Sequence, residues 1–295
     1  MYSNLFYRGI FYTCIASFFW GLPQPIFFNE LSHVPSLEVA LHRGLWSFIL
    51  LFILLSFFLK FDEFIYIFYS IKKILILSIT ACLISINWTG FIFAVSIEKI
   101  HEASMGYFIT PIITIVLGYF FLNERITKIK MISLTLMSIS IILLIYNSKI
   151  IPFLPILIGT TWGIYNLLRK KIDVSPATGL LYESFFISII AIPALIFLYY
   201  KNVGFFFNYN YYTDILLIMT GLVTIFPLFL FNLGVKYIPL GLAGVLFYLA
   251  PTFHFITSYY IFDETIPAYK LVSFIIIWIG VCLYIYDSLK KEKLS

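Results

Sequence analysis

Three ionisable residues stand at the edges of long apolar segments, and their chemistry could recognise a solute. His42 and Arg43 lead into one charge-free run, and Glu183 leads into another. A guanidinium inside so apolar a segment is costly and usually faces a cavity or a partner. If a helix begins near Ser36, its rise of 1.5 Å per residue places Arg43 roughly 10 Å along the axis. Arg43 can therefore face an internal cavity, or it can extend back to an aqueous interface.

Glu183 lies 141 positions after His42, which makes the two residues candidates for equivalent polar sites. A buried acid can bind a cationic group, carry a proton or form a structural ion pair. An imidazole can change its charge near neutral pH. The spacing predicts two related sites, and no direct contact between the two side chains is assumed.

Two prolines interrupt apolar runs at equivalent positions, Pro111 and Pro251. Each proline frees the carbonyl four residues earlier, at Tyr107 and Phe247. Freed backbone groups in an apolar setting are tolerated beside a polar cavity, although a packing kink is the simpler alternative. We expect the two prolines to approach each other at mid-depth with a cavity between them. The aromatic and amide side chains expected to wall this cavity are Trp20, Asn87, Trp88, Tyr107, Tyr165, Phe247 and Tyr248.

Such walls suit amphipathic or aromatic solutes. Any single aromatic side chain among them can equally face lipid or the core, since 20% of the residues are aromatic.

The elements that must position these residues are membrane-spanning helices. Only 11% of the residues are charged and 62% are hydrophobic, whereas a soluble domain has about 25% charged residues. A helix needs about 20 apolar residues to cross a bilayer. Period-2 alternation, which barrel strands require, is missing from the apolar runs. The charge-free runs are 9–29, 44–59, 74–97, 103–123, 131–148, 150–168, 184–200, 215–235, 237–262 and 271–286. The sequence therefore predicts an all-α polytopic protein with ten transmembrane helices.

The basic residues predict the orientation. With ten spans and the N-terminus inside, 14 Lys and Arg residues fall on the inner side and 4 fall outside, so both termini are expected in the cytoplasm. The basic clusters, including 169–171, are interpreted as topology signals and not as a nucleic-acid site. The aromatic segment 201–214 is expected to lie in the outer interface.

The two halves of the chain repeat each other. Residues 103–148 match 243–288 at 12 of 46 positions without a gap, and the pair Trp20-Gly21 recurs as Trp162-Gly163. We expect two repeats, 1–148 and 149–295, of five helices each. Because five is odd, the repeats must run in opposite directions through the membrane, as they do in many secondary transporters. Glu124 and Glu264 end equivalent helices and are expected to anchor loops by hydrogen bonds.

Several stretches resemble the EamA-type drug/metabolite transporter superfamily. They are "FFWGLPQPIFFNELSHVPSLEVALHRGLWSF" (18–48), "NWTGFIFAV" (87–95), "HEASMGYFITPIITIVLGYFFLNER" (101–125), "LLRKKIDVSPATGLLYES" (167–184) and "FIIIWIGVCLYIYD" (274–287). The resemblance spans nearly the whole chain. It implies two five-helix repeats and transport across the bacterial cytoplasmic membrane, with no particular substrate.

The expected function is therefore a secondary transporter for a small organic metabolite or drug-like solute, working by alternating access. No GxxxxGK[ST] loop is present for an ATPase, and neither an enzymatic activity nor a cofactor is expected. The three cysteines lack metal-ligand spacing. A membrane-embedded lipid enzyme and a non-transporting scaffold or sensor remain as alternatives. The expected partners are the solute and membrane lipid. The small residues of "GTTWG" (159–163) fit either an internal helix contact or a homodimer seam.

Overall fold

The computed structural model describes residues 2–57, 61–96, 100–148, 153–261 and 267–292, and all regular structure in these ranges is helical. The first half contains α1 (Tyr2–Gly21), α2 (Pro23–Asn29), α3 (Ser36–Phe57), α4 (Phe61–Ile67), α5 (Ile71–Ser96), α6 (Ile100–Leu122) and α7 (Lys128–Ser148). The second half contains α8 (Phe153–Lys171), α9 (Pro176–Tyr200), α10 (Tyr211–Tyr237), α11 (Leu240–Leu246), α12 (Leu249–Tyr260) and α13 (Ala268–Glu292).

The described part of each of the ten charge-free runs falls on one helix or on two consecutive helices, which confirms the prediction of an all-α polytopic membrane protein. Within the described residues, eight helical segments are long and apolar enough to cross a bilayer, and Gly106–Leu122 of α6 is a shorter apolar segment. The helix α8 is less apolar because it ends in Arg169, Lys170 and Lys171. Much of α8 is buried between neighbouring helices, so it can carry more polar residues than a lipid-facing helix.

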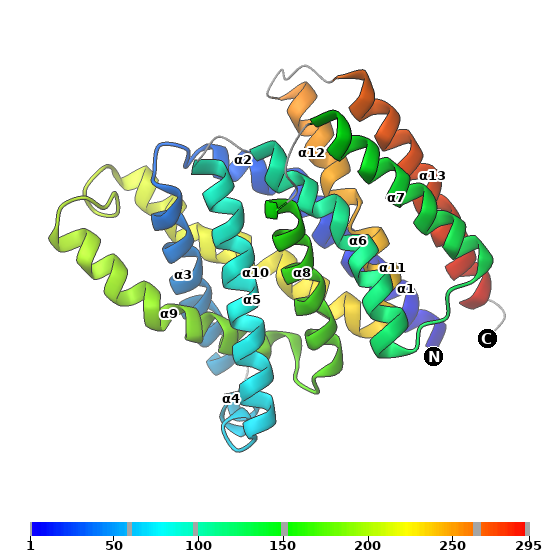
Figure 1. Ribbon diagram of the computed structural model, residues 1–295. Helices are drawn as coiled ribbons and strands as arrows, with labels where there is room; N and C mark the ends of the chain where they lie inside the picture. The colour runs from blue at the N-terminus through cyan, green and yellow to red at the C-terminus, as the bar shows by residue number, and fades with distance from the viewer. Residues whose placement is uncertain (1, 58–60, 97–99, 149–152, 262–266, 293–295) are drawn as a thin grey trace.

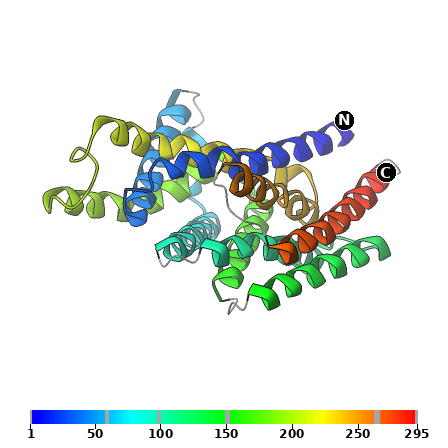
Figure 2. The same cartoon turned by 90° about the horizontal axis from the view of Figure 1, so that it is seen from above.

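The helices pack with the symmetry expected of two repeats. Helix α1 lies against α10, and its counterpart α8 lies against α5, the counterpart of α10. Helix α8 also lies against α6, and three further pairs bring equivalent helices together, namely α3 with α9, α6 with α11, and α7 with α13. The α7–α13 pair forms one edge of the bundle in both views (Figure 1, Figure 2). The two ends of the chain lie at the same end of the bundle (Figure 1), as an even number of crossings requires.

The two stretches that contain the equivalent prolines differ in structure. Helix α6 runs through Pro111 as one helix, whereas the equivalent stretch divides into α11 and α12 at Phe247 and Tyr248. The Phe247 carbonyl, which Pro251 frees, accepts a bond from the Ala250 N–H at 2.9 Å. The expectation that both helices break is therefore met only in the second half, where a tight turn satisfies the freed carbonyl.

The proposed boundary between the repeats falls at residues 148 and 149. Residues 149–152 lie outside the described ranges, so the boundary stays a prediction. The small residues of 159–163 are used internally. A Cβ on Gly159 would lie 3.0 Å from the Gly106 carbonyl oxygen, and one on Gly163 would lie 2.7 Å from Ile113, so both glycines allow α8 to approach α6.

Candidate functional site

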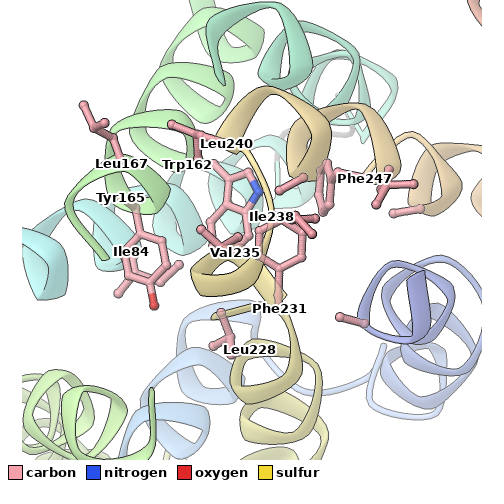
Figure 3. Close-up of a cluster of buried hydrophobic side chains, with 14 of the residues drawn as sticks. Ile84, Trp162, Tyr165, Leu167, Leu228, Phe231, Val235, Ile238, Leu240 and Phe247 are labelled. Atoms are coloured by element: carbon pink, nitrogen blue, oxygen red, sulfur yellow. The ribbon is translucent and has the colours of Figure 1, made fainter. Parts of the chain in front are cut away.

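Aromatic rings from both halves meet at the centre of the bundle. The Trp20 ring at the end of α1 lies 5.4 Å from Trp162 of α8, 5.3 Å from Phe231 of α10 and 5.6 Å from Phe247. Figure 3 shows Trp162, Phe231 and Phe247 gathered where α8, α10 and α11 meet. Trp20 and Trp162 are equivalent residues of the repeats, so the structure brings the recurring Trp-Gly pairs into one cluster.

Tyr107 extends this cluster toward the end of the bundle that is distant from the chain termini. Its ring lies 5.6 Å from Phe247 and 5.9 Å from the His254 imidazole. A hydrogen bond of 2.8 Å joins His254 Nε2 to the Trp20 carbonyl oxygen. His254 therefore links α12 to the end of α1.

Arg43 points inward from α3 to the edge of this region. Its guanidinium lies over the Trp88 ring at 4.5 Å and the Phe28 ring at 5.0 Å, and its Nε donates to Thr224 Oγ1 at 3.0 Å. Two aromatic faces and the Thr224 hydroxyl thus replace part of the water that the cation loses. Among the described residues, no carboxylate forms an ion pair with Arg43.

Asn87 has a different role from its neighbour Trp88. The Asn87 Nδ2 donates to the Ile158 carbonyl at 2.8 Å and to Thr161 Oγ1 at 3.1 Å. These bonds hold α5 against α8. The structure therefore gives Asn87 a tethering role and leaves Trp88 beside the Arg43 guanidinium.

Glu183 lies in a buried polar network nearer the terminal end of the bundle. Thr80 Oγ1 donates to Glu183 Oε1 at 2.7 Å, and the Tyr165 hydroxyl donates to Oε2 at 3.1 Å. Asn232 Nδ2 donates to the Tyr165 oxygen at 2.9 Å. The network joins α5, α8, α9 and α10, so it fastens both halves to one another.

The basic partner of Glu183 is Arg169, which sequence reasoning missed. Arg169 Nε lies 3.6 Å from Glu183 Oε1, and both side chains are almost fully buried, at 2% and 3% exposure. Its Nη2 donates to the Pro176 carbonyl at 3.1 Å. In the sequence Arg169 is one of three consecutive basic residues at a helix end, which is typical of a topology signal. No pattern in the sequence distinguishes it from Lys170 and Lys171.

His42 does not share a site with Arg43. Successive residues of a helix point about 100° apart, so His42 faces α9 and the connection to α10 while Arg43 faces α5 and α10. The Trp46 Nε1 donates to His42 Nδ1 at 3.0 Å, and His42 Nε2 lies 4.0 Å from Glu38 Oε1. His42 and Glu183 are equivalent in the repeats, yet the first lines a peripheral cavity and the second belongs to an interior ion pair.

The proline region is held by close backbone contacts. A Cβ on Gly244 would lie 3.3 Å from the Pro111 Cα, so α11 meets α6 at this proline. The Tyr248 hydroxyl donates to the Phe108 carbonyl at 2.8 Å. Pro251 is buried near the start of α12. The approach of Pro111 to Pro251, and a cavity between them, stay predictions.

Equivalent residues of the two repeats differ in exposure. Trp20 and Tyr107 are half-buried, whereas their counterparts Trp162 and Phe247 are 4% and 3% exposed. Trp162 stacks on Tyr165, whose hydroxyl donates to Glu183, whereas Phe247 packs against Trp20 and Tyr107. The side chains around Glu183 are therefore tightly packed, and those around Arg43 and Tyr107 are packed more loosely. Among the described residues, no group of three His, Cys, Asp or Glu side chains could hold a metal ion.

Comparisons with known proteins agree with this architecture. Residues 7–146 and 149–286 each match the EamA-like transporter family. The chain is 31% identical to the uncharacterized transporter YojE of Bacillus subtilis, over 98% of this chain and 97% of YojE. It is 29% identical to the protein RarD of Escherichia coli, over 97% of this chain and 96% of RarD. One crystal structure superposes with a TM-score of 0.70 at 12% identity, covering 95% of this chain and 98% of the other, and so shows the same fold. The chain is a multi-pass membrane protein that belongs to the EamA-like transporter family.

Proposed function

We propose that this protein is a secondary transporter that moves a small organic metabolite or drug-like solute across the bacterial cytoplasmic membrane by alternating access. The observation that carries the proposal is the unequal exposure of equivalent residues. Trp20 and Tyr107 are half-buried, their counterparts Trp162 and Phe247 are almost fully buried, and the packing is tighter around Glu183 than around Arg43. If the two repeats exchange conformations, the tightly packed end opens and the looser end closes.

The orientation follows from the charge distribution. The positive-inside bias supports an orientation with both termini in the cytoplasm, and in that orientation the tightly packed end, with Arg169 and Glu183, faces the cytoplasm. The end with Arg43 and Trp20 then faces outward. In this proposal the structure is an outward-facing conformation, and the Arg169–Glu183 network is part of its inner closure.

The chemistry around Arg43 suggests the type of solute. The Arg43 guanidinium is half-buried, lies on two aromatic faces and has no carboxylate partner among the described residues. It can therefore donate hydrogen bonds to an anionic or carbonyl group of a solute. The rings of Trp20, Trp88 and Tyr107 can hold its apolar or aromatic body. We therefore expect a solute with an aromatic or apolar body and at least one strong hydrogen-bond acceptor.

The test begins with a thermal-shift screen of metabolites and antibiotics on the purified protein, since a bound solute raises the unfolding temperature. A solute found this way is then loaded into proteoliposomes and its flux is measured. We expect Arg43→Lys to weaken the thermal shift, because an ammonium cannot stack on two rings as a guanidinium does. The exposed Lys72→Gln variant serves as a matched control and should behave as wild type.

Glu183→Gln distinguishes binding from transport. If Glu183 belongs to the inner closure, its variant should still bind solute near Arg43 but should lose most of the flux. Binding without any flux in the wild-type protein would contradict transport and would favour a scaffold or sensor. Chemical conversion of the solute would favour a membrane-embedded enzyme.

A further inference from the structure

A cavity of about 400 Å³ lies away from the centre of the bundle, between α3, α9 and the connection 201–210. Its apolar walls include Leu45, Ile192, Leu195, Ile196 and Tyr199. This volume falls within the range of small-ligand sites. Ile192, Ile196 and Tyr199 are 42%, 50% and 51% exposed on the surface of α9, so this side of the cavity faces the lipid chains.

Two buried polar atoms without hydrogen-bond partners belong to residues that line the cavity. Glu38 is 2% exposed and His42 is 1% exposed, and both line the cavity. Among the described residues, Glu38 Oε2 and His42 Nε2 have no hydrogen-bond partner. A buried polar atom left unpaired is costly, and each such atom in a native structure requires an explanation.

The surrounding contacts fix what these two atoms can bind. Glu38 Oε1 accepts the backbone N–H groups of Phe205 at 2.7 Å and Phe206 at 3.2 Å, so the carboxylate is held in place and Oε2 remains an acceptor. Because His42 Nδ1 accepts the indole N–H of Trp46, the neutral imidazole carries its proton on Nε2, which lies 4.0 Å from Glu38 Oε1. The group that these contacts leave to a ligand is therefore the carboxylate oxygen Glu38 Oε2.

The connection that closes the cavity is fastened in an unfavourable conformation. Phe207 has a φ of 63°, in the left-handed region that non-glycine residues rarely adopt. Its backbone N–H is held by Asp214 Oδ1 at 2.8 Å, next to the two N–H groups that Glu38 holds. Phe206 packs its ring 4.7 Å from the His42 imidazole. The connection is thus shaped around the polar end of the cavity and does not lie loosely over it.

The charges of the lining residues and the depth of the cavity in the membrane indicate which kind of ligand it can bind. Among the described residues that line it, Glu38 is the only acidic one and none is Lys or Arg, so an anionic group would meet the Glu38 carboxylate with no basic side chain beside it. Glu38 is the third residue of α3, and Tyr200 ends α9, so the polar end lies at interfacial depth. The apolar part runs along α9 toward the hydrocarbon. An amphipathic molecule with a cationic head at the interface matches both ends.

We propose that this cavity binds the ammonium head of an amphipathic amine, with its aliphatic chain along α9. The N–H groups of the head donate to Glu38 Oε2, and the rings of Phe206 and His42 lie beside the cation. The amine comes either from a free long-chain amine or from the headgroup of an aminophospholipid. The site is separate from the Arg43 region, so the inference does not depend on transport.

The experiment uses Trp46, which contacts both His42 and Phe206, as a reporter. The full chain is placed in phosphatidylcholine nanodiscs, whose choline groups have no N–H to donate. A brominated dodecylamine and a brominated dodecanol of the same chain are titrated, and the quenching of tryptophan fluorescence is recorded. The signal of Trp46 is obtained by difference from the Trp46→Phe variant.

We expect saturable quenching of Trp46 by the amine, at a concentration about tenfold below that for the alcohol, which corresponds to one charge-assisted bond. Glu38→Gln should remove this preference while its side-chain oxygen still accepts the Phe205 and Phe206 N–H groups. Ile192→Trp should fill the cavity from the lipid side and lower the affinity without touching Glu38, after correction for the added indole. The control Glu30→Gln, at an exposed carboxylate, should behave as wild type.

Two further measurements separate the sources of the amine. Nanodiscs that contain brominated phosphatidylethanolamine should quench Trp46 more than those with brominated phosphatidylglycerol if a lipid headgroup occupies the cavity. If only the free amine quenches selectively, the ligand is a free amphipathic amine. Equal quenching by amine and alcohol in the wild type, with equal quenching by both lipids, would overturn the proposal and leave a cavity open to any lipid chain.

Discussion

The Tyr248 hydroxyl donates a hydrogen bond to the backbone carbonyl of Phe108, 2.8 Å away, and these two residues occupy equivalent positions of the two repeats. The rings of the same two residues lie 6.2 Å apart. A residue and its own counterpart can meet only near the axis that relates the repeats. The contact therefore marks where α6 and the α11–α12 turn cross that axis.

Replacing Tyr248 with phenylalanine removes this bond and keeps the ring. We expect a loss of about 1 kcal/mol in unfolding free energy, since the buried hydroxyl and its bond are both removed and the Phe108 carbonyl loses this donor. Denaturant unfolding in detergent measures the loss. Tyr146→Phe, at a side chain that is 80% exposed, is the matched control and should leave the stability unchanged.

Removing one charge of the buried Arg169–Glu183 ion pair should lower the free energy of unfolding more than replacing both residues. Glu183→Gln leaves the Arg169 guanidinium buried without its anion, which typically costs about 3–5 kcal/mol. Arg169→Met should cost a similar amount because it leaves the carboxylate unpaired. The double variant should be more stable than the sum of the two changes predicts, and thermal unfolding of all four proteins measures this coupling. Strict additivity would show that the two charges do not interact.

Gly179 is the position where a single methyl group should be least tolerated. A Cβ at this residue would lie 1.7 Å from Arg169 Nη1, far inside van der Waals contact, and the arginine is buried among helices and cannot move away. We expect Gly179→Ala to lower the unfolding temperature or the yield of folded protein.

Gly90→Ala provides the comparison for this change. Among the described residues, its Cβ would meet Leu157 at 3.6 Å and Ile158 at 3.7 Å, which are ordinary contacts, so the variant should fold as wild type does. Equal behaviour of the two variants would contradict the placement of Arg169 against α9.

Glu63 of α4 should make the stability depend on acid pH. Burial alone would raise its pKa, but bonds from the Thr178 hydroxyl at 2.6 Å and the Ser175 N–H at 2.7 Å outweigh this and hold the pKa below 4.5. A depressed pKa in the folded state stabilises the protein above the unfolded value, and this contribution is lost as the pH falls through the folded pKa. The unfolding temperature of wild type should therefore approach that of Glu63→Gln as the pH drops below about 4.5. The exposed Asp62→Asn variant should follow wild type at every pH.

The fold could be predicted from the sequence because the patterns that indicate it extend over whole helices and occur in both halves of the chain. Charge-free runs of helical length predict spans, since charge is costly in a bilayer. An odd number of helices in each repeat then requires the inverted arrangement. The anchor role expected of Glu124 is observed, because its carboxylate accepts the Leu240 and Gly241 N–H groups at the start of α11. The equivalent Glu264 lies outside the described residues.

The candidate site could be predicted less well from the sequence, because it depends on the direction in which each side chain points from its helix. His42 and Arg43 are adjacent in sequence, and the helical rotation sends them to different sites. Arg169 looks like its neighbours Lys170 and Lys171, and only the packing of α8 against α9 reveals that it is buried. Pro111 and Pro251 are equivalent in sequence, yet α6 continues through one while the chain turns just before the other. The residue types can be read from the sequence, but the direction and the burial of each side chain depend on tertiary packing.

Helix α6 is joined to α11 and the following turn at three heights. Glu124 holds the first N–H groups of α11, Pro111 lies against Gly244, and Phe108 accepts the Tyr248 hydroxyl. Helix α6 and helix α11 therefore cannot move past each other without losing all three contacts. If the ends of the bundle open and close as proposed, we expect α6 and α11 to stay fixed against each other while other helices move around them.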